Sequence, residues 1–149
     1  MSVKEFVLKK LEENRGIPLS GEAIANSLSV SRAAVWKAVR ALEAEGYHIE
    51  AVPNQGYTLC TDNDLLSTQG ILPYLTPPLK SREIRVFPCL PSTNQEAKRM
   101  ALESAEQGSA VLAEEQSAGR GRLGRSFFSP RGNGLYMSVI PVSYTHLTL

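Results

Sequence analysis

The sequence is poor in cysteine and has no long apolar run. Its 149 residues include two thiols, Cys60 and Cys89, and neither has C-x-x-C or metal-ligand spacing. A disulfide framework or a metal centre is therefore not expected, and neither thiol is assigned a function. Residues 1–11 are charged, and no later stretch approaches the length needed to span a bilayer. These absences predict a cytoplasmic protein with no signal peptide, membrane anchor or membrane partner.

Acidic residues are missing from the carboxy-terminal part of the chain. No Asp or Glu follows Glu115, whereas the last 34 residues carry four arginines. By formal charge, residues 1–60 sum to 7 − 7 = 0, residues 61–115 to 5 − 8 = −3, and residues 116–149 to +4. The arginines at the basic end have no carboxylate close in sequence, so we expect their charge to be available to an anionic ligand.

The remaining composition is that of a soluble globular protein, because 42% of the residues are hydrophobic and 21% are charged. The length permits one ordinary domain or two small ones. No internal repeat is evident, and the turn-forming residues Thr61-Asp62-Asn63-Asp64 are the best candidate for a hinge. The sequence thus predicts two domains, over residues 1–61 and 62–149.

The first domain begins with three segments of helical character. Apolar residues recur at helical spacing over residues 3–11. Ser20 can cap a short helix over residues 21–27, and Ser31 can cap another helix that runs to Glu45. The last two segments form a helix, a turn and a second helix.

After Gly46 the apolar period changes to two, which predicts a β-hairpin around Pro53-Asn54-Gln55-Gly56. Three helices and a hairpin make a winged helix-turn-helix, whose third helix enters the DNA major groove. Val35, Val39 and Leu42 form the inner stripe of that helix. The residues expected to contact DNA are Ser31, Arg32, Ala33, Trp36, Lys37 and Arg40. A helical protein-interaction domain is the alternative, because the net charge of this domain is zero.

In the second domain the sequence predicts three strands, over residues 82–90, 109–115 and 135–140. A short helix over residues 65–75, broken at Pro73, precedes them, and Pro77-Pro78 extends the connection.

A further helix is predicted over residues 95–106, with Gly108 as its terminator. Ser92-Thr93-Asn94 stands at its start. Taken alone, these three residues are explained by helix capping.

Three glycines and three arginines alternate in Gly119-Arg120-Gly121-Arg122-Leu123-Gly124-Arg125. Glycines let the backbone approach a ligand, and arginines offer planar charged forks that suit phosphate or carboxylate oxygens. The glycines fit the dinucleotide pattern G-x-G-x-x-G, but no downstream Asp or Glu can hold a ribose and the following residues open a helix poorly. An RNA-binding RGG-like segment would be repetitive, which this one is not. A solvated basic loop is the plain alternative.

This loop resembles the glycine-arginine motif of the biotin–protein ligases, together with Phe128-Ser129-Pro130 and Leu135-Tyr136-Met137-Ser138 after it and Ser92-Thr93-Asn94 before it. The resemblance covers residues 1 to about 140. It implies an α+β protein, in which a winged helix-turn-helix precedes the start of a mixed α/β, class II synthetase-like ligase domain. In that family the loop closes over biotin and its adenylate, and Ser-Thr-Asn lines the biotin pocket.

The resemblance also implies an activity and its residues. Such a bifunctional enzyme activates biotin with ATP and Mg²⁺, transfers it to a lysine of a biotin carboxyl carrier protein, and represses transcription as a homodimer on operator DNA. Arg122 and Arg125 are the expected catalytic residues, and Arg125 either orders the loop or contacts phosphate. The expected biotin-binding residues are Ser92, Thr93, Asn94, Gln116, Arg120, Gly121 and Arg122.

The resemblance stops near residue 141. Family members continue with further strands and a Lys-Trp-Pro-Asn segment whose lysine contacts substrate, and residues 141–149 do not match that continuation. We therefore expect a truncated chain without ligase activity. The opposing hypothesis is a winged-helix regulator that senses a small acid without catalysis. The operator sequence and the oligomeric state cannot be read from the sequence.

Overall fold

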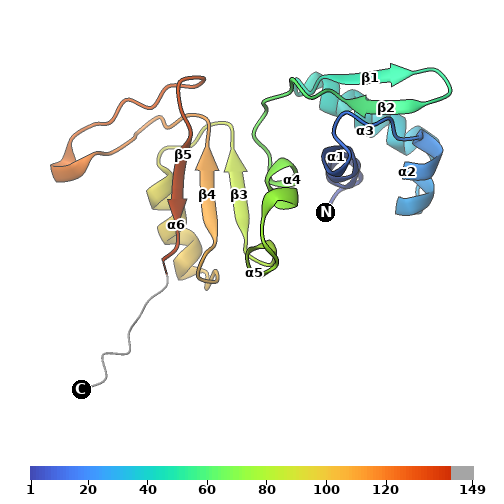
Figure 1. The fold of residues 1–149 in the computed structure, drawn as a ribbon. Coiled ribbons are helices and arrows are strands. Elements are labelled where there is room, and N and C mark those ends of the chain that lie inside the picture. Colours follow the sequence, from blue (N-terminus) through green and yellow to red (C-terminus); the bar gives the residue numbers. More distant parts are fainter. Residues whose placement is uncertain (142–149) are drawn as a thin grey trace. The chain divides into compact units, whose positions relative to one another are not determined.

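The computed structural model describes residues 1–141, which divide into two compact units. Unit 1 spans Met1–Pro73, and unit 2 begins at Tyr74. In Figure 1 unit 1 contains the blue helices and the green hairpin, and unit 2 contains the yellow to red sheet. Residues 142–149, which include His146, lie outside the described residues. No helix within the described part of the chain is long and apolar enough to cross a membrane.

Three helices build unit 1, and a serine caps each of them. The helices are α1 (Val3–Glu13), α2 (Gly21–Leu28) and α3 (Arg32–Ala44). The hydroxyls of Ser2, Ser20 and Ser31 accept hydrogen bonds from backbone N–H groups of the first turn, which a helix start leaves unpaired. The two predicted caps, Ser20 and Ser31, are therefore confirmed, and each helix lies within two residues of its expected ends.

A two-stranded antiparallel hairpin follows, formed by β1 (Ile49–Val52) and β2 (Gly56–Leu59). Gly56 has a φ of 108°, and a Cβ atom there would lie 2.0 Å from the backbone oxygen of Leu19. Only glycine therefore allows Leu19 and Tyr57 to exchange their two backbone hydrogen bonds of 2.8 Å. These bonds tie the hairpin to the segment before α2.

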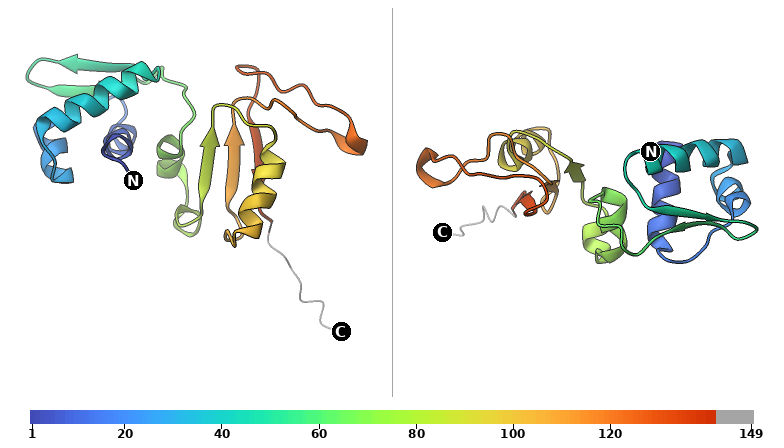
Figure 2. Two further views of the ribbon diagram at one scale, coloured as in Figure 1. Left: turned by 180° about the vertical axis from the view of Figure 1, so that it is seen from behind. Right: turned by 90° about the horizontal axis from the view of Figure 1, so that it is seen from above.

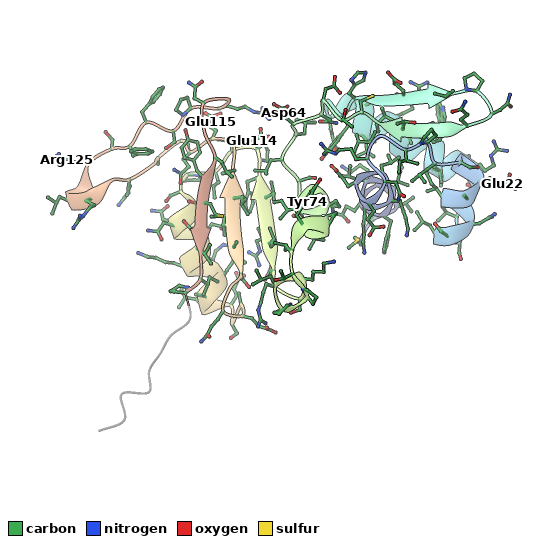
Figure 3. All side chains as sticks on the ribbon, in the orientation of Figure 1. Glu22, Asp64, Tyr74, Glu114, Glu115 and Arg125 are labelled. Carbon is green, nitrogen blue, oxygen red and sulfur yellow. The ribbon has the colours of Figure 1, made fainter. Side chains whose placement is uncertain are left out.

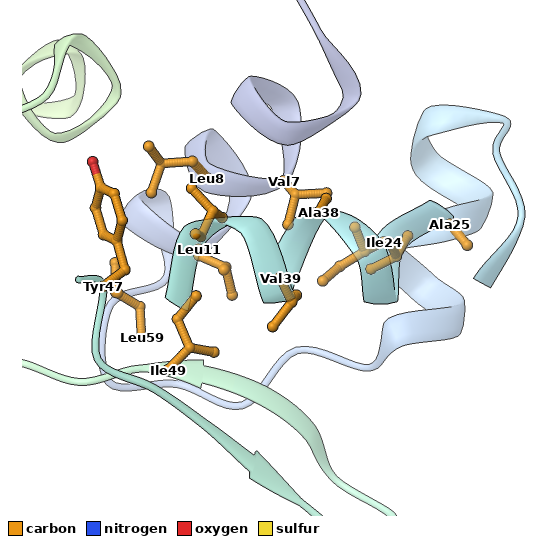
Figure 4. Close-up of a cluster of buried hydrophobic side chains, with 12 residues drawn as sticks. Val7, Leu8, Leu11, Ile24, Ala25, Ala38, Val39, Tyr47, Ile49 and Leu59 are labelled. Carbon is orange, nitrogen blue, oxygen red and sulfur yellow. The ribbon is translucent and has the colours of Figure 1, made fainter. Parts of the chain in front are cut away.

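A single apolar core closes unit 1, and Figure 4 shows most of its side chains. It contains Val7, Leu8, Leu11, Ile24, Ala25, Val35, Ala38, Val39, Leu42, Tyr47, Ile49 and Leu59. The predicted inner stripe of α3 is confirmed, because its three members are at most 2% exposed. Val3 and Phe6, in contrast, lie at the margin of the core at 37% and 38% exposed. Leu8 is buried instead, because it shares a helical stripe with Leu11.

The segment after the hairpin packs onto unit 1. The Arg15 guanidinium donates to the Glu12 carboxylate and to the backbone oxygen of Asn63, each at 2.7 Å. Asn63 is buried, and Leu65 packs against the apolar core. Unit 1 therefore extends beyond the hinge that the turn-forming residues predicted near position 62. Turn propensity reports local geometry, whereas here side chains distant in sequence hold the turn in place.

Three short helices lead from this segment toward the sheet. α4 (Thr68–Ile71) packs against α1 and continues into the 3-10 helix η1 (Leu72–Tyr74), so the helix expected over residues 65–75 is shorter than predicted. The expectation that Pro77-Pro78 only extends the connection is wrong, because these prolines begin α5 (Pro77–Lys80). The first helical turn leaves its N–H groups unpaired in any case, so proline is tolerated there.

Unit 2 is built on a three-stranded sheet of order β3-β4-β5. Its elements are β3 (Ile84–Phe87), α6 (Thr93–Leu102), β4 (Ala110–Ala113) and β5 (Tyr136–Val139). β3 and β4 are parallel and connected through α6, whereas β5 is antiparallel to β4, as Figures 1 and 2 show. The three predicted strands are confirmed. In open α/β sheets of this kind, ligands bind beyond the carboxyl ends of the strands.

α6 covers one face of this sheet. The buried core there consists of Leu90, Ala97, Met100, Val111 and Ala113. On the other face, Met137 and Val139 are 59% and 49% exposed. α6 ends at Leu102, before the predicted residue 106, and Ser104 shortly after it has a positive φ of 67°. Unit 2 thus has one packed and one partly uncovered face among the described residues.

Candidate functional site

The outer face of α3 is accessible along its length. All six residues expected to contact DNA are exposed, namely Ser31, Arg32, Ala33, Trp36, Lys37 and Arg40. Among residues 1–141, neither Arg32 nor Lys37 forms an ion pair. The Ser31 hydroxyl accepts from the Ala34 N–H at 3.2 Å, so its own hydrogen is still available to donate to a ligand.

Arg40 is more engaged than the sequence predicted. Its guanidinium carbon lies 5.6 Å from the centroid of the Trp36 ring, and its Nη1 atom lies 2.9 Å from a carboxylate oxygen of Glu43. Glu43 reaches back because it follows Arg40 by three positions on one helix face. Trp36 is 51% exposed, which confirms its predicted place on the surface. The unpaired positive charge of this face is therefore concentrated on Arg32 and Lys37.

A groove of about 490 Å³ lies between the start of α2, Arg32 and the hairpin. Gly21, Glu22 and Pro53 are among its lining residues. Arg32 thereby continues the basic face of α3 toward the hairpin. Glu22, labelled in Figure 3, also lines the groove, and its negative charge disfavours a phosphate there.

In unit 2, four polar side chains meet beside the sheet, and we call Thr93, Gln116, Ser129 and Ser138 the Gln116 cluster. Thr93 and Gln116 follow the carboxyl ends of β3 and β4, whereas Ser138 lies on β5 opposite Val111. The Gln116 side-chain oxygen accepts from the Thr93 N–H at 2.8 Å and from the Thr93 hydroxyl at 3.1 Å. The Gln116 amide nitrogen donates to the Ser129 hydroxyl at 3.1 Å. The hydroxyls of Thr93 and Ser138 lie 2.9 Å apart. The cluster therefore places hydroxyls and one amide at a single point.

The Gln116 cluster explains how α6 begins. Ser92 occupies the N-cap position and is buried, but its side chain makes no capping hydrogen bond. Gln116 performs that role from another segment by accepting the Thr93 N–H. Helix capping, the simplest reading of Ser92, is therefore wrong. Of the expected biotin-binding residues in this region, Thr93 and Gln116 touch, Ser92 adjoins them, and Asn94 is exposed on the first turn of α6.

Ser129 and Ser138 belong to the cluster although the sequence did not single them out as site residues. Ser138 lies between the exposed Met137 and Val139 on β5, so strand alternation alone turns it toward the covered face. The sequence did not give this signal, because the apolar Leu135, Met137 and Val139 alternate with Ser138 and would by pattern face the core. The position of Ser129 depends on the pairing of residue 116 with residue 129, which no local pattern reveals.

The glycine-arginine loop is an irregular hairpin that leaves the sheet beyond the Gln116 cluster, as the orange segment of Figure 1 shows. Its tip is the 3-10 turn η2 (Arg122–Gly124). Three backbone hydrogen bonds close it, from Gln116 N to Ser129 O at 3.0 Å, Phe127 N to Gly119 O at 2.8 Å and Gly121 N to Arg125 O at 2.7 Å. In this conformation the Gly121 N–H is thus occupied by the loop itself.

Gly119 and Gly121 differ in whether the loop conformation has room for a side chain. A Cβ atom at Gly119 would lie 2.5 Å from the Phe127 backbone oxygen and 2.6 Å from the Ser129 hydroxyl. A Cβ atom at Gly121 would meet its nearest neighbour, the Arg125 backbone oxygen, at an ordinary 3.6 Å. Glycine at position 119 is therefore required by the loop's own pairing, whereas at position 121 this conformation does not require it.

Three of the four carboxy-terminal arginines are free of acidic partners. Arg120, Arg122 and Arg125 are exposed and form no ion pair within residues 1–141. Arg131, however, pairs with Glu114 at 2.6 Å, so the expectation that all four lack a carboxylate is wrong. Folding brings a residue of the preceding acidic region next to Arg131. Figure 3 places Arg125 at the far tip of the loop, away from Glu114 and the sheet.

An ion-pair network fixes α6 on the sheet below the cluster. The Glu96 carboxylate lies 3.0 Å from Arg99 Nε and 3.1 Å from Arg85 Nη1. Arg85 also reaches Glu83 and Glu103. Hydrogen bonds from Arg99, and then from Arg85, lower the pKa of Glu96, and burial acts against them.

The described residues do not supply a protein site for Mg²⁺. This ion prefers oxygen ligands in octahedral geometry. In the part of the chain that the structure describes, His48, Glu50 and Cys60 form the one group whose ligand atoms converge, and only one of these three atoms is an oxygen. No described residue is therefore assigned to Mg²⁺.

Comparison with known proteins gives the class of this chain. Residues 3–58 match a family described as HTH domain, and residues 86–145 match the biotin/lipoate A/B protein ligase family. The chain is therefore similar to an HTH domain in its first part and to biotin/lipoate ligases in its second part, which confirms the predicted resemblance. The ligase match reaches past residue 141, where the resemblance was expected to stop.

Two relatives narrow the comparison. The bifunctional ligase/repressor BirA of Bacillus subtilis is 38% identical over 122 residues, which cover 82% of this chain and 38% of the relative. The bifunctional ligase/repressor BirA of Escherichia coli is 39% identical over 120 residues, which cover 80% of this chain and 36% of the relative. The chain thus spans less than two fifths of the length of the curated relatives it matches.

Proposed function

We propose that this chain is part of a bifunctional protein that ligates biotin and represses transcription in response to it. The Gln116 cluster carries this proposal, because hydroxyls and an amide meet there and two of its members, Thr93 and Gln116, follow the carboxyl ends of parallel strands. A ureido ring such as that of biotin requires paired donors and acceptors of this kind. Ser92, Thr93, Asn94 and Gln116 are assigned to the biotin head.

The loop is assigned to the charged end of the substrate. Biotin activation means attack of its carboxylate oxygen on the α-phosphorus of ATP, with pyrophosphate as the leaving group. The amine of a carrier-protein lysine then attacks the acyl carbon, and AMP leaves. Arg120, Gly121 and Arg122 would contact the carboxylate and the adenylate phosphate, and Arg125 would contact phosphate or order the loop. Their unpaired charge supports this role, since each bond to a charged group is worth about 1.5–3 kcal/mol.

Loop closure follows from the same proposal. Leu123 at the tip has a φ of 59° and is 94% exposed, so its backbone is strained and its apolar side chain is left in water. Phe127 and Phe128 are 55% and 86% exposed. Folding this loop over the adenylate would bury all three apolar side chains, bring the arginines to the phosphate and exclude water from a hydrolysable anhydride.

For unit 1 we propose operator binding through α3, with the hairpin as a wing. Arg32 and Lys37 carry the charge for DNA, and Ser31, Ala33, Trp36 and Arg40 complete the contact surface.

In a selection from random duplexes by the 149-residue chain, Arg32→Ala should relax base preference. Lys37→Ala should weaken binding to all duplexes and flatten its salt dependence. Absence of binding to any duplex at low salt would favour a protein-interaction domain instead.

Calorimetry with biotin and with a non-hydrolysable biotinyl-adenylate analogue tests the ligase part. Thr93→Ala should weaken both ligands equally, whereas Arg122→Ala should weaken the analogue about tenfold or more beyond its effect on biotin. Equal losses of affinity for biotin and for the analogue in Arg122→Ala would show that Arg122 does not contact the phosphate. Unaltered binding in Thr93→Ala would show that the Gln116 cluster does not contact biotin.

We also propose that the described residues do not suffice for catalysis, because two apolar side chains on one face of their sheet, Met137 and Val139, are 59% and 49% exposed. Pyrophosphate release from ATP and biotin by the 149-residue chain would contradict this. Binding of biotin with no pyrophosphate release, even by a longer chain that contains these residues, would favour the non-catalytic sensor.

A further inference from the structure

Four side chains with metal-binding atoms lie close together at the base of the hairpin. Ile49 and Leu59 are opposite each other and point into the core, at 7% and 0% exposed. Side chains alternate between the two faces of a strand, so the residues on either side of this pair face outward. His48 and Glu50 flank Ile49, and Cys60 follows Leu59, so these three residues face outward. Asp62 lies in the turn beyond the end of β2 and is exposed.

The cross-strand register brings these residues together. The Cys60 N–H donates to the His48 backbone oxygen at 2.9 Å, which places the two residues opposite each other. The ligand atoms of His48, Glu50 and Cys60 all lie within 4.8 Å of one another. The fourth residue joins through His48, whose Nδ1 atom lies 3.1 Å from Asp62 Oδ1 and 3.2 Å from Asp62 Oδ2. The ligand atoms of His48, Glu50 and Cys60 therefore converge, and Asp62 adjoins them through His48.

We propose that His48, Glu50, Cys60 and Asp62 form a binding site for a zinc-like divalent transition-metal ion. One imidazole, one thiolate and two carboxylates are the ligand types that Zn²⁺ takes in tetrahedral sites. Bonds of about 2.0–2.3 Å put tetrahedral ligand atoms about 3.5 Å apart, so the side chains must draw together slightly. They are free to do so, because the His48 and Asp62 side chains are 56% and 69% exposed.

The ligand set also selects among ions. Ca²⁺ and Mg²⁺ prefer all-oxygen coordination and gain little from a thiol and an imidazole. The two carboxylates and the thiolate would bring three negative charges, which a divalent cation largely compensates. A bound ion would join the end of the wing to the segment that leads out of it, in addition to the Arg15 contact with Asn63. The site is independent of the biotin and DNA assignments.

Cobalt(II) titration of the 149-residue chain tests the proposal, because thiolate-bound Co²⁺ has a characteristic near-ultraviolet charge-transfer absorption. We expect this band to develop to one ion per chain and to disappear on addition of Zn²⁺. Cys60→Ser should abolish the band, and His48→Ala should lower the affinity at least tenfold. Asp62→Asn should lower it about 10–100-fold, whether Asp62 binds the ion or orients His48.

Cys89→Ser is the matched control, since Cys89 is the other free thiol and is exposed in unit 2. It should leave the band and the affinity unchanged. Thermal unfolding provides a second readout, because Zn²⁺ should raise the melting temperature of unit 1 in the parent chain and in Cys89→Ser but not in Cys60→Ser. Loss of the band in Cys89→Ser, its persistence in Cys60→Ser, or an unchanged affinity in His48→Ala would overturn the proposal.

Discussion

Unit 1 and unit 2 hold their binding residues in different ways. In unit 1 the core is closed by three helices and the hairpin, and it fixes α3 with its outer face exposed. In unit 2 the buried core is smaller and lies on one side of the sheet, and the arginines lie on a hairpin loop stabilised mainly by backbone pairing. A preformed surface suits DNA, whose shape is regular, whereas a movable loop suits a reactive small molecule that must be enclosed.

The largest expected effect is confined to unit 1. Leu42→Ala removes a fully buried side chain from its core and should lower the free energy of unfolding of unit 1 by about 2–5 kcal/mol. Amide hydrogen exchange should show lost protection in α1 to α3 and unchanged protection in β3 to β5. Leu102→Ala is the control, because Leu102 is 87% exposed and its removal should cost less than about 0.5 kcal/mol. Equal loss of protection in both units would show that they unfold as one.

A smaller effect is expected in the glycine-arginine loop. Gly119→Ala places a Cβ atom against the Phe127 backbone oxygen, so the loop must open its pairing at a cost of about 1–3 kcal/mol. NMR shifts should change from residue 116 to residue 129 and remain constant in unit 1. Gly121→Ala, which has room for the added atom, should leave the free loop unchanged. Identical spectra for Gly119→Ala and the parent chain would disprove the close approach.

Acid sensitivity should distinguish the two units further. The pKa of Glu96 is lowered below its ordinary 4.5, so its stabilisation of unit 2 is complete above about pH 4.5 and is lost as the pH falls through the folded-state pKa. Glu96→Gln should therefore cost about 1 kcal/mol or less at pH 7, and the cost should shrink as the solution is made more acidic. Urea unfolding at neutral and at acidic pH, followed in unit 2, measures the difference. A cost that does not change with pH would contradict this electrostatic role.

The smallest expected effect concerns the surface of α3. Arg40→Ala removes the guanidinium from the Trp36 ring and should lower the stability of unit 1 by about 0.5 kcal/mol. The fluorescence of Trp36, the single tryptophan of the chain, reports the change directly. Lys37→Ala, an equally exposed change on the same helix, should leave the emission as it is. An unchanged spectrum in Arg40→Ala would show that the ring and the guanidinium do not interact in solution.

The sequence predicted the local elements well because their signals are local. The apolar stripe of α3, the serines at the helix starts and the alternation of the hairpin each follow from side-chain spacing. The glycine-arginine loop was also located correctly between two strands. These features require no knowledge of what lies opposite them.

The remaining features depend on contacts between distant segments. Capping of α6 by Gln116, rather than by Ser92, requires the register of the loop against the strand before it. The pairing of Arg131 with Glu114 has the same origin. Local patterns do not show that His48 and Cys60 are close, because these cross-strand neighbours lie twelve positions apart in sequence. Propensity rules describe neither kind of partnership.

The glutamine that caps α6 from a distant segment also has a consequence for how such sequences can vary. Its side chain meets a threonine and a serine with both ends of its amide, and the threonine in turn meets a second serine. Replacing one member alone leaves a buried donor or acceptor unpaired, which costs about 1–3 kcal/mol. Positions 93, 116, 129 and 138 should therefore change together or not at all among homologous chains, as one covarying set drawn from four separate segments.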